Sequence, residues 1–374
     1  MHRRPRYDAA HSILGPAIEI ALMKIDPSDL PAVALGTFAP ISGGGAPFPA
    51  LVTHGEVHAL AEIPGLAALR GAGLRDVFDQ WDDVWPRLRA LLPELEARQG
   101  REAATLEPRL PLEPRQIICA GANYRRHVIE LMTDHDVSSP MGLNRSERQR
   151  RATQMMDHRA AHGQPFAFVK PVSSLLGPGE ELIVPADSHQ PDWELELAVV
   201  IGRPCYRVSQ GEALDYVAGY TIANDISARD RLSRRDIPAM GLDFIAGKGA
   251  PGFFPLGPLI VPAAFVPDPQ ALEIQLKLNG RVMQQESTAD MIFSVRRLIE
   301  FLSTYMRLLP GDILSTGSPA GNGTHYNRFL QGGDVMEGRI TGLGVQVVRC
   351  VAESCAPGAP HHRPFVPLPA LENA

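Results

Sequence analysis

One strand, acidic at its start and apolar on both faces at its end, constrains the fold of this chain most. In PDWELELAVVIGR, residues 191–203, apolar side chains alternate with a second set that begins with Glu194 and Glu196 and ends with Ala198 and Val200. This period of two predicts a β-strand. Because the far end is apolar on both faces, the strand must lie inside a sheet that is covered on each side. Two like charges about 7 Å apart beside a core cost free energy unless a cation meets them.

The remaining pattern predicts a β-rich α+β protein. Short apolar runs separated by glycine and proline turns dominate from about residue 113 onward, and SVRRLIEFLSTYMRL is the clearest helix there. Many short strands with few helices are typical of a sandwich, a barrel or a folded roll. The strand-like runs are QIICAGA, FAFVKP, ELIVP, WELELAVVIG, YVAGYTIAND, GPLIVP, EIQLKLNG, DILSTG and GVQVVRCV.

The organisation along the chain predicts two domains and a tail. Residues 1–112 are expected to form a small α+β domain with one helix in LRDVFDQWDDVWPRLRALLPELEARQG. Residues 106–116 carry three prolines and are interpreted as a linker. Residues 113–352 would form the catalytic domain, and the proline-rich residues 353–374 an extended tail.

Composition argues against several classes of partner. The net charge of −6 and the lack of a basic stripe indicate no nucleic-acid partner. No apolar run approaches the ~18 residues that span a bilayer, and the N-terminal region has no pattern of a secretory signal, so no membrane association is expected. The four cysteines have neither CxxC nor zinc spacing, which favours thiols in a reducing compartment and a cytoplasmic location.

A third carboxylate extends the acidic theme. The apolar strand in YVAGYTIANDISARD delivers Asp225 at its carboxyl end. Three converging carboxylates at Glu194, Glu196 and Asp225 would suit Mg²⁺ or Mn²⁺, which take oxygen ligands and leave positions for water and substrate. The residues alone leave open a solvated acidic strand end and a plain Asn-Asp turn.

The segment QIICAGANYRRHVIELM predicts a strand, a glycine turn and a helix with Asn123 as N-cap. His127 and Glu130 then share one helix face at i and i+3. A carboxylate beside an imidazole can orient it and raise its basicity, which suits a general base acting on water. A surface His–Glu pair is the alternative that the spacing leaves open.

The order of these motifs resembles the fumarylacetoacetate hydrolase family over residues 113–351, about two thirds of the chain. The region N-terminal to it is similar to the small variable domain that this family often carries. The resemblance rests on ICAGANYRRHVIEL, FAFVKPVSSLLGPGEELIVP, DWELELAVVIGR, AGYTIANDISARD, GKG, FFPLGP, LNGRVMQQESTADMIFSVRRLIEFLS and LLPGDILSTGSPAGNG, in that order.

The resemblance implies a folded mixed β-roll catalytic domain, a homodimer and a bound Mg²⁺, Mn²⁺ or Ca²⁺ ion. By position, the metal ligands would be Glu194, Glu196 and Asp225. The catalytic residues would be His127 and Glu130, which activate water, and Lys248 of GKG, which faces the substrate. The substrate-binding residues would be Tyr124, Lys170, Thr316, Gly317 and Ser318.

These residues together predict a metal-dependent hydrolase of a carbon–carbon bond in a 2,4-dioxo acid resembling an acylpyruvate. The substrate would chelate the ion through its carboxylate and 2-oxo oxygens. The same constellation also fits an oxaloacetate-type decarboxylase, or an isomerase or hydratase of a 2-oxo acid related to hydroxymuconate or a sugar acid. A module that binds a keto acid without turnover is the alternative outside enzymes.

The chain departs from the family pattern at three places. Ala250, Pro251 and Gly252 follow GKG where relatives carry an aromatic-Asp-Thr run, and Ser318 replaces a threonine. Residues 132–163 form a long insertion, in which we expect one charged helix that Ser146 caps and Gly163 ends. As a lid, this insertion could bring Arg151, His158 or Arg159 to the substrate, and a solvated or dimer-contact helix is the other interpretation.

Overall fold

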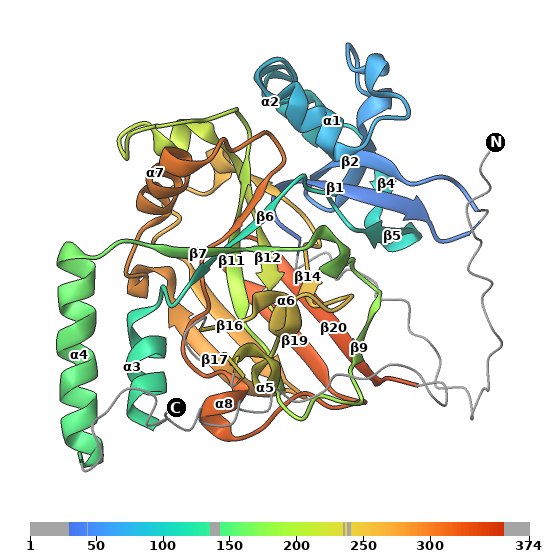
Figure 1. Ribbon diagram of the computed structural model, residues 1–374. Helices are drawn as coiled ribbons and strands as arrows, with labels where there is room; N and C mark the ends of the chain where they lie inside the picture. The colour runs from blue at the N-terminus through green and yellow to red at the C-terminus, as the bar shows by residue number, and fades with distance from the viewer. Residues whose placement is uncertain (1–29, 43, 135–142, 235, 238–240, 355–374) are drawn as a thin grey trace, which may run out of the picture.

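The computed structural model of the chain describes residues 30–42, 44–134, 143–234, 236–237 and 241–354 (Figure 1). Its elements confirm the predicted β-rich α+β class, with two large sheets in the catalytic part and a third sheet near the N-terminus. Apart from its first two residues, the predicted proline-rich tail lies outside the described residues. None of the described helices is long and apolar enough to cross a membrane.

The N-terminal part is an antiparallel sheet with helices on one side. The first four residues of the predicted linker form a strand that pairs with the first strand of this sheet, so the linker interpretation is wrong for these four. Arg115 and Gln116, at the end of the predicted linker, lead to the next sheet. The strands run in the order β4-β3-β2-β1-β5, with α1 and α2 beside them. Their bounds are β1 Val33–Pro40, β2 Phe48–Thr53, β3 Glu56–Ala59, β4 Arg101–Glu102, β5 Leu106–Arg109, α1 Leu74–Asp79 and α2 Trp81–Glu96.

A six-stranded sheet in the order β15-β12-β11-β18-β6-β7 carries the acidic strand in its interior. The predicted strand is β11, which pairs with β12 on one side and with β18 on the other. Both neighbours are antiparallel to it, whereas β18 and β6 are parallel. The bounds are β6 Ile117–Gly121, β7 Phe166–Lys170, β11 Leu195–Ile201, β12 Val217–Asn224, β15 Val261–Pro262 and β18 Ile313–Ser315.

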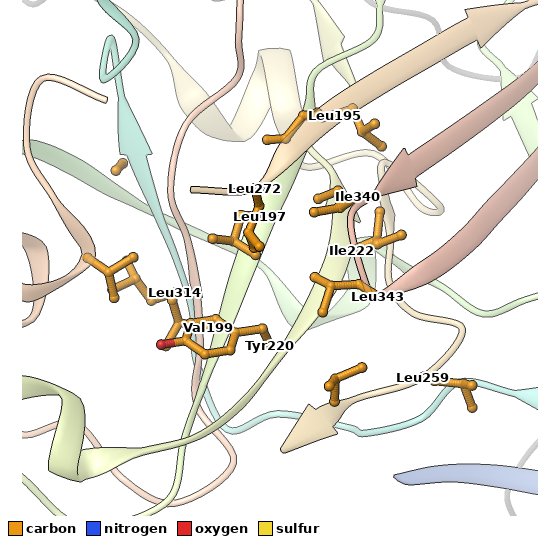
Figure 2. Close-up of a cluster of buried hydrophobic side chains, with 14 of the residues drawn as sticks. Leu195, Leu197, Val199, Tyr220, Ile222, Leu259, Leu272, Leu314, Ile340 and Leu343 are labelled. Carbon is orange, nitrogen blue, oxygen red and sulfur yellow. The ribbon is translucent and has the colours of Figure 1, made fainter. Parts of the chain in front are cut away.

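A five-stranded sheet packs against one face of β11 and forms the main core with it. Leu195, Leu197 and Val199 lie in one apolar cluster with Ile340 of this second sheet (Figure 2). Leu276 of the same sheet belongs to this cluster too. The strand order is β17-β16-β19-β20-β9. The bounds are β9 Glu181–Val184, β16 Glu273–Leu278, β17 Arg281–Ser287, β19 Val335–Ile340 and β20 Gly344–Ala352.

The other face of β11 packs against the N-terminal part. Ala198 and Val200 belong to a second apolar cluster that includes Leu35 of β1 and Trp81 of α2. A backbone hydrogen bond of 2.7 Å from Leu35 to the carbonyl of Ile260 joins the two parts directly. One apolar core thus continues from the N-terminal sheet into the six-stranded sheet. That residues 1–112 form a separate domain therefore stays a prediction. The arrangement also explains why the acidic face of β11 turns apolar.

The insertion contains the expected helix, α4, Arg145–His162. It is capped by Asn144 rather than by Ser146, because the Asn144 side chain accepts from the amide of Glu147 at 3.0 Å. Gly163 ends it as predicted. Met156 of α4 lies in an apolar cluster with residues of the neighbouring helix α3, Arg125–Asp134. Figure 1 shows the two helices side by side at the edge of the molecule.

Short elements complete the surroundings of the site. Two-stranded pairs join β8, Leu175–Leu176, to β14, Phe254–Pro255, and β10, Pro191–Asp192, to β13, Ser227–Ala228. The helix predicted in SVRRLIEFLSTYMRL is α7, with Ser294 as its N-cap. The remaining α-helices are α5 Arg229–Leu232, α6 Phe244–Lys248, α7 Val295–Tyr305 and α8 Gly323–Tyr326.

Because the two large sheets pack against each other, a cavity between them should strongly lower the free energy of unfolding. Leu276 of β16 is fully buried, so Leu276→Ala should lower the free energy of unfolding by about 2–5 kcal/mol. Ile183 of β9 is 50% exposed, and Ile183→Ala should cost less than about 1 kcal/mol. Denaturant unfolding of both variants checks this, and equal losses would contradict the assigned core.

Candidate metal centre

The pairing of β11 with β12 brings the three carboxylates together. Glu194 and Glu196 stand at the start of β11, whereas Asp225 follows the end of β12. Because the strands are antiparallel, with Leu195 opposite Asn224, the start of one lies beside the end of the other. The amide of Asp225 donates to the carbonyl of Glu194 at 2.8 Å, which locks this corner.

The three carboxylates converge on one point. One oxygen from each of Glu194, Glu196 and Asp225 lies within 4.8 Å of the other two. The residues are 7%, 1% and 1% exposed, so water screens their repulsion poorly. Of the interpretations that the sequence left open, a solvated strand end is therefore excluded.

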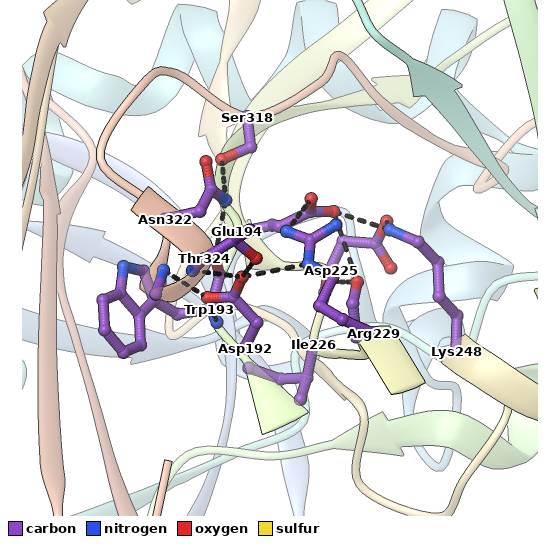
Figure 3. A network of polar contacts seen from close by, with 12 residues as sticks. Asp192, Trp193, Glu194, Asp225, Ile226, Arg229, Lys248, Ser318, Asn322 and Thr324 are labelled. Atoms are coloured by element: carbon purple, nitrogen blue, oxygen red, sulfur yellow. Dashed lines mark hydrogen bonds and ion pairs between the residues drawn. The ribbon is translucent and has the colours of Figure 1, made fainter. Parts of the chain in front are cut away.

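Two lysines meet this negative charge, and Figure 3 shows one of them, Lys248. Lys248, at the end of α6, donates to Glu194 at 2.6 Å and to Asp225 at 2.5 Å. Burial opposes its charged form, but Asp225 and Glu194 outweigh burial and raise its pKa. Lys170, on the edge strand β7, donates to the other oxygen of Asp225 at 2.5 Å. Three strands separate β7 from β12, so this contact requires a strongly curled sheet.

An arginine and a fourth carboxylate complete the network, and the sequence analysis missed both. Arg229, the first residue of α5, donates to Glu194 at 2.6 Å and to Asp192 at 2.9 Å. Asp192 is fully buried. Burial opposes the charge of Glu194, yet Arg229, Lys248 and His127 outweigh it, and its pKa falls well below the usual value. The polar residues at the start of DWELE and at the end of NDISARD are the sequence features that could have identified Asp192 and Arg229.

Glu196 has a different environment from its two neighbours. Ser315 and the amide of Gly317 donate to its Oε2 at 2.5 and 2.8 Å. Burial and the nearby charges of Asp225 and Glu194 raise its pKa to about 8. Both hydrogen bonds come from neutral donors, so they compensate its charge less than the lysines compensate that of Asp225.

The donor set fits a hard divalent cation. Carboxylate oxygens from Glu194, Glu196 and Asp225 are the ligands that Mg²⁺ and Mn²⁺ prefer. The raised pKa of Glu196 points to uncompensated negative charge at the point where the three meet. A cation there would favour the charged form of Glu196. The three residues remain predicted ligands.

His127 and Glu130 of α3 lie beside this network. Both line a narrow pocket together with Asn322, Thr324 and His325. Desolvation, helped by Arg229 and Lys248 and opposed by Glu194, lowers the pKa of His127 to about 4. Its imidazole is thus neutral at pH 7 and can accept a proton.

Glu130 has other contacts than the sequence suggests. Among the described residues, its contacts run to Arg126 at 3.3 Å and to His325 at 3.9 Å. An orienting role of Glu130 toward His127 stays a prediction. His325 itself was missed, since nothing in SPAGNGTHY distinguishes it from a surface histidine.

The predicted substrate-binding residues surround the carboxylates more than they line the pocket. Lys170 and Gly317 hold Asp225 and Glu196, and Thr316 donates its hydroxyl to the carbonyl of Leu197 at 2.8 Å. Their polar groups are thus occupied within the protein, and a role toward substrate stays a prediction for each.

The other two predicted substrate-binding residues are also buried. Tyr124 is fully enclosed, and burial raises the pKa of its hydroxyl well above the usual value. Ser318 accepts from Gln284 at 2.9 Å and donates to the carbonyl of Pro319. Both lie on the turns that enter the site, and their role toward substrate likewise stays a prediction.

Asn123 is not a helix cap, contrary to the sequence interpretation. Its amide donates to the carbonyls of Phe293 and Thr316 at 3.0 and 2.8 Å, and its oxygen accepts from the amide of Phe293. Gly317, with a φ of +97°, has its Cα hydrogen against Asn123, where a Cβ would approach to 2.9 Å. Asn123 therefore ties the turn before α3 to the loop that holds Glu196.

Of the three charged residues that a lid would bring to the substrate, two are exposed and one contacts the turn before α3, and the lid role stays a prediction. Arg151 and His158 are exposed on α4. Arg159 donates to the carbonyl of Ala122 and lies over the ring of Phe293. In this structure α4 thus supports α3 from outside.

A larger pocket of about 400 Å³ lies elsewhere, between β9 and the segment after α8. Its lining includes His189, Arg328 and Glu353, and none of the predicted site residues.

Comparisons with known proteins agree with this geometry. Residues 116–351 match the family model described as fumarylacetoacetate (FAA) hydrolase C-terminal. A 2,4-didehydro-3-deoxy-L-rhamnonate hydrolase from Sphingomonas is 37% identical over 76% of this chain and 90% of its own length. A human mitochondrial oxaloacetate tautomerase is 34% identical over 70% of this chain and 74% of its own length.

The solved structures include a maleylpyruvate hydrolase from Sphingobium in complex with manganese(II) and pyruvate. It is 25% identical, with a TM-score of 0.62, and the match covers 86% of this chain and 100% of that one. Relatives of this chain are therefore hydrolases and related enzymes, and their small-molecule chemistry supports an enzyme here too. With the matched family model covering most of the catalytic part, the chain belongs to the fumarylacetoacetate hydrolase family.

Proposed function

We propose that this protein is a metal-dependent hydrolase that cleaves a carbon–carbon bond of a 2,4-dioxo acid similar to an acylpyruvate. The observation that carries the proposal is the buried carboxylate trio, which Lys248 contacts directly and which lies near the pocket lined by His127. Such a site can take a proton from water and stabilise a developing anion within the same pocket.

Glu194, Glu196 and Asp225 would hold Mg²⁺, Mn²⁺ or Ca²⁺. When bound, the ion supplies Lewis-acid polarisation and a template for a chelating keto acid. Asp192 and Arg229 support this role, because they fix the orientation of Glu194 from behind.

His127 takes one proton from water, and the hydroxide attacks the carbonyl distal to the substrate carboxylate. The bond between that carbon and the adjacent CH₂ carbon breaks, and the electron pair stays on the fragment that becomes pyruvate enolate. The other fragment leaves as a carboxylic acid. His127 then returns its proton to the enolate carbon, which balances the reaction.

Lys248 remains an ammonium throughout, since Asp225 and Glu194 raise its pKa. Its positive charge would stabilise the enolate electrostatically. A binding module that sequesters a keto acid needs neither a neutral imidazole nor this lysine, so the pair favours turnover.

The relatives support the hydrolase and also favour one alternative. A rhamnonate hydrolase and a maleylpyruvate hydrolase agree with hydrolysis. The oxaloacetate tautomerase favours a proton shift on a related acid without added water. His127 could perform either step, because both begin with proton abstraction by a neutral base.

Product analysis separates these activities. The metal-stripped protein, reloaded with Mg²⁺ or Mn²⁺, is incubated with a panel of acylpyruvates and with oxaloacetate. Metal-dependent release of pyruvate plus a carboxylic acid is the expected result. Enol–keto exchange of oxaloacetate alone would indicate a tautomerase, and pyruvate with carbon dioxide a decarboxylase. Ligand-induced stabilisation without any product would indicate a binding module.

A homodimer remains a prediction from the family resemblance, and a cytoplasmic location a prediction from the cysteine pattern. Light scattering of the purified protein should give twice the chain mass, and a monomer mass at micromolar concentration would contradict the dimer.

Removal of one ligand should abolish metal binding. Glu194→Gln keeps the shape of the side chain but removes a charge from the trio. We expect Mn²⁺ affinity to fall by more than about 100-fold, because even residues that only support ligands change metal affinity about 10–100-fold. Isothermal titration measures it. Glu337→Gln, at a 42% exposed side chain on β19, is the control, and unchanged Mn²⁺ affinity in Glu194→Gln would refute the site.

Removal of the base should separate binding from chemistry. His127→Ala should keep Mn²⁺ affinity within a few-fold and lower kcat by about 10²–10⁴-fold. Steady-state kinetics on the best acylpyruvate measures the effect. His189→Ala, at an exposed position in the other pocket, should behave as wild type. A His127→Ala rate near wild type would show that the assigned base is wrong.

A further inference from the structure

Helix α3 carries the proposed base, and side chains of other elements hold it near both ends. Its amino-terminal turn is tied down at Arg126, whose amide donates to Asp290 at 2.9 Å. Toward its other end, Glu130 and Asp134 face α8 across a narrow pocket. The position of His127 therefore depends on what α8 offers to that face, together with the packing of α3 on α4.

The residue that α8 offers is His325. Its Nδ1 lies 3.2 Å from Asp134 and 3.9 Å from Glu130. Asp134 also accepts from Arg145 of α4 at 2.8 Å through its second oxygen. His325 and Arg145 thus hold Asp134 from two sides, and α3 is fastened between α8 and α4.

Helix α8 is in turn anchored to the metal ligands. Asp192 accepts from the amide of Gly323 at 2.6 Å and from the hydroxyl of Thr324 at 2.9 Å. Arg229 joins Asp192 to Glu194 (Figure 3). Asn322 adds a hydrogen bond of 2.8 Å to the carbonyl of Trp193, directly before Glu194.

We propose that His325 is a positioning residue that fixes helix α3, and with it His127, over the carboxylate trio. The polar path runs from Glu194 through Arg229 and Asp192 to α8, and from His325 to Asp134. Along this path, the side chain of His325 makes the contact between α8 and α3. Both of its partners on α3 are carboxylates. The proposal rests on the proposed function only in taking His127 as the base.

The pair is partly exposed, with side chains 36% and 23% accessible. Such a pair contributes little to global stability, so variants of His325 are expected to fold. Its effect is on geometry, because a displacement of a catalytic group by about 1 Å can cost about 100-fold in rate.

The test uses His325→Leu, His325→Asn and the control His189→Leu in the full chain. With Mn²⁺ bound, His325→Leu should lower kcat about 10- to 100-fold, whereas KM and Mn²⁺ affinity stay within about threefold. The amide nitrogen of His325→Asn stands near the position of Nδ1 and can donate to Asp134, so it should recover most of the loss. His189→Leu should change neither value.

A second readout does not require turnover. Hydrogen–deuterium exchange of peptides covering residues 125–134 should become faster in His325→Leu, while peptides of β11 and β12 keep their wild-type rates. The double variant His325→Leu/Asp134→Ala should lose less than the sum of the two single variants, since the contact between His325 and Asp134 is removed in each of them.

The outcomes distinguish this proposal from the proposed function. Unchanged exchange in α3 would overturn the positioning role, even if the wild-type protein hydrolyses none of the dioxo acids. A raised KM with unchanged kcat would also overturn it, since His325 would then contact substrate directly. Loss of Mn²⁺ affinity in His325→Leu would assign the residue to the metal site instead.

Discussion

The compensation of buried negative charge by buried positive charge is the interaction on which this structure depends. Glu194, Glu196 and Asp225 would repel one another strongly at their depth, and Lys170, Lys248 and Arg229 are drawn in from three separate elements to oppose them. The lysine from β7 can reach only because the sheet curls. The shape of the sheet and the charge of the site therefore require each other.

The buried charges make the fold less stable than apolar residues would, but they make the chemistry of the site possible. Well-packed apolar residues would be at least as stable as buried ion pairs, yet they could hold neither a cation nor a polarised substrate. Glu196 shows the cost most directly, since burial and the charges of Asp225 and Glu194 raise its pKa to about 8. The apolar faces of β11 offset that cost by packing against two separate cores.

Much of this could be read from the sequence, because the informative patterns are local. Alternation in WELELAVV located β11, and the acidic start of that strand located two of the carboxylates. The end of the strand in YVAGYTIAND located Asp225, the helix after Gly121 located His127, and the order of motifs brought in Lys248. These residues need no knowledge of distant contacts beyond the pairing of two neighbouring strands.

The residues that the sequence analysis missed act across the fold. Asp192, Arg229 and His325 have ordinary local surroundings, and their roles come from partners 35 to 191 positions away, such as Asp134 for His325. Asn123 was misread for the same reason, since a cap is a local role and its real partners are Phe293 and Thr316. β5 was hidden by prolines that an edge strand tolerates.

The shared core behind β11 has a consequence for how such a protein can change. The face that carries Glu194 and Glu196 continues as Ala198 and Val200, which rest on residues of the N-terminal sheet and of α2. Substitutions in that region contact no polar group of the site, yet they can displace the backbone of the strand that bears two carboxylates. Evolution could therefore change the geometry of the site through the volume of these apolar side chains, while every reacting group stays the same.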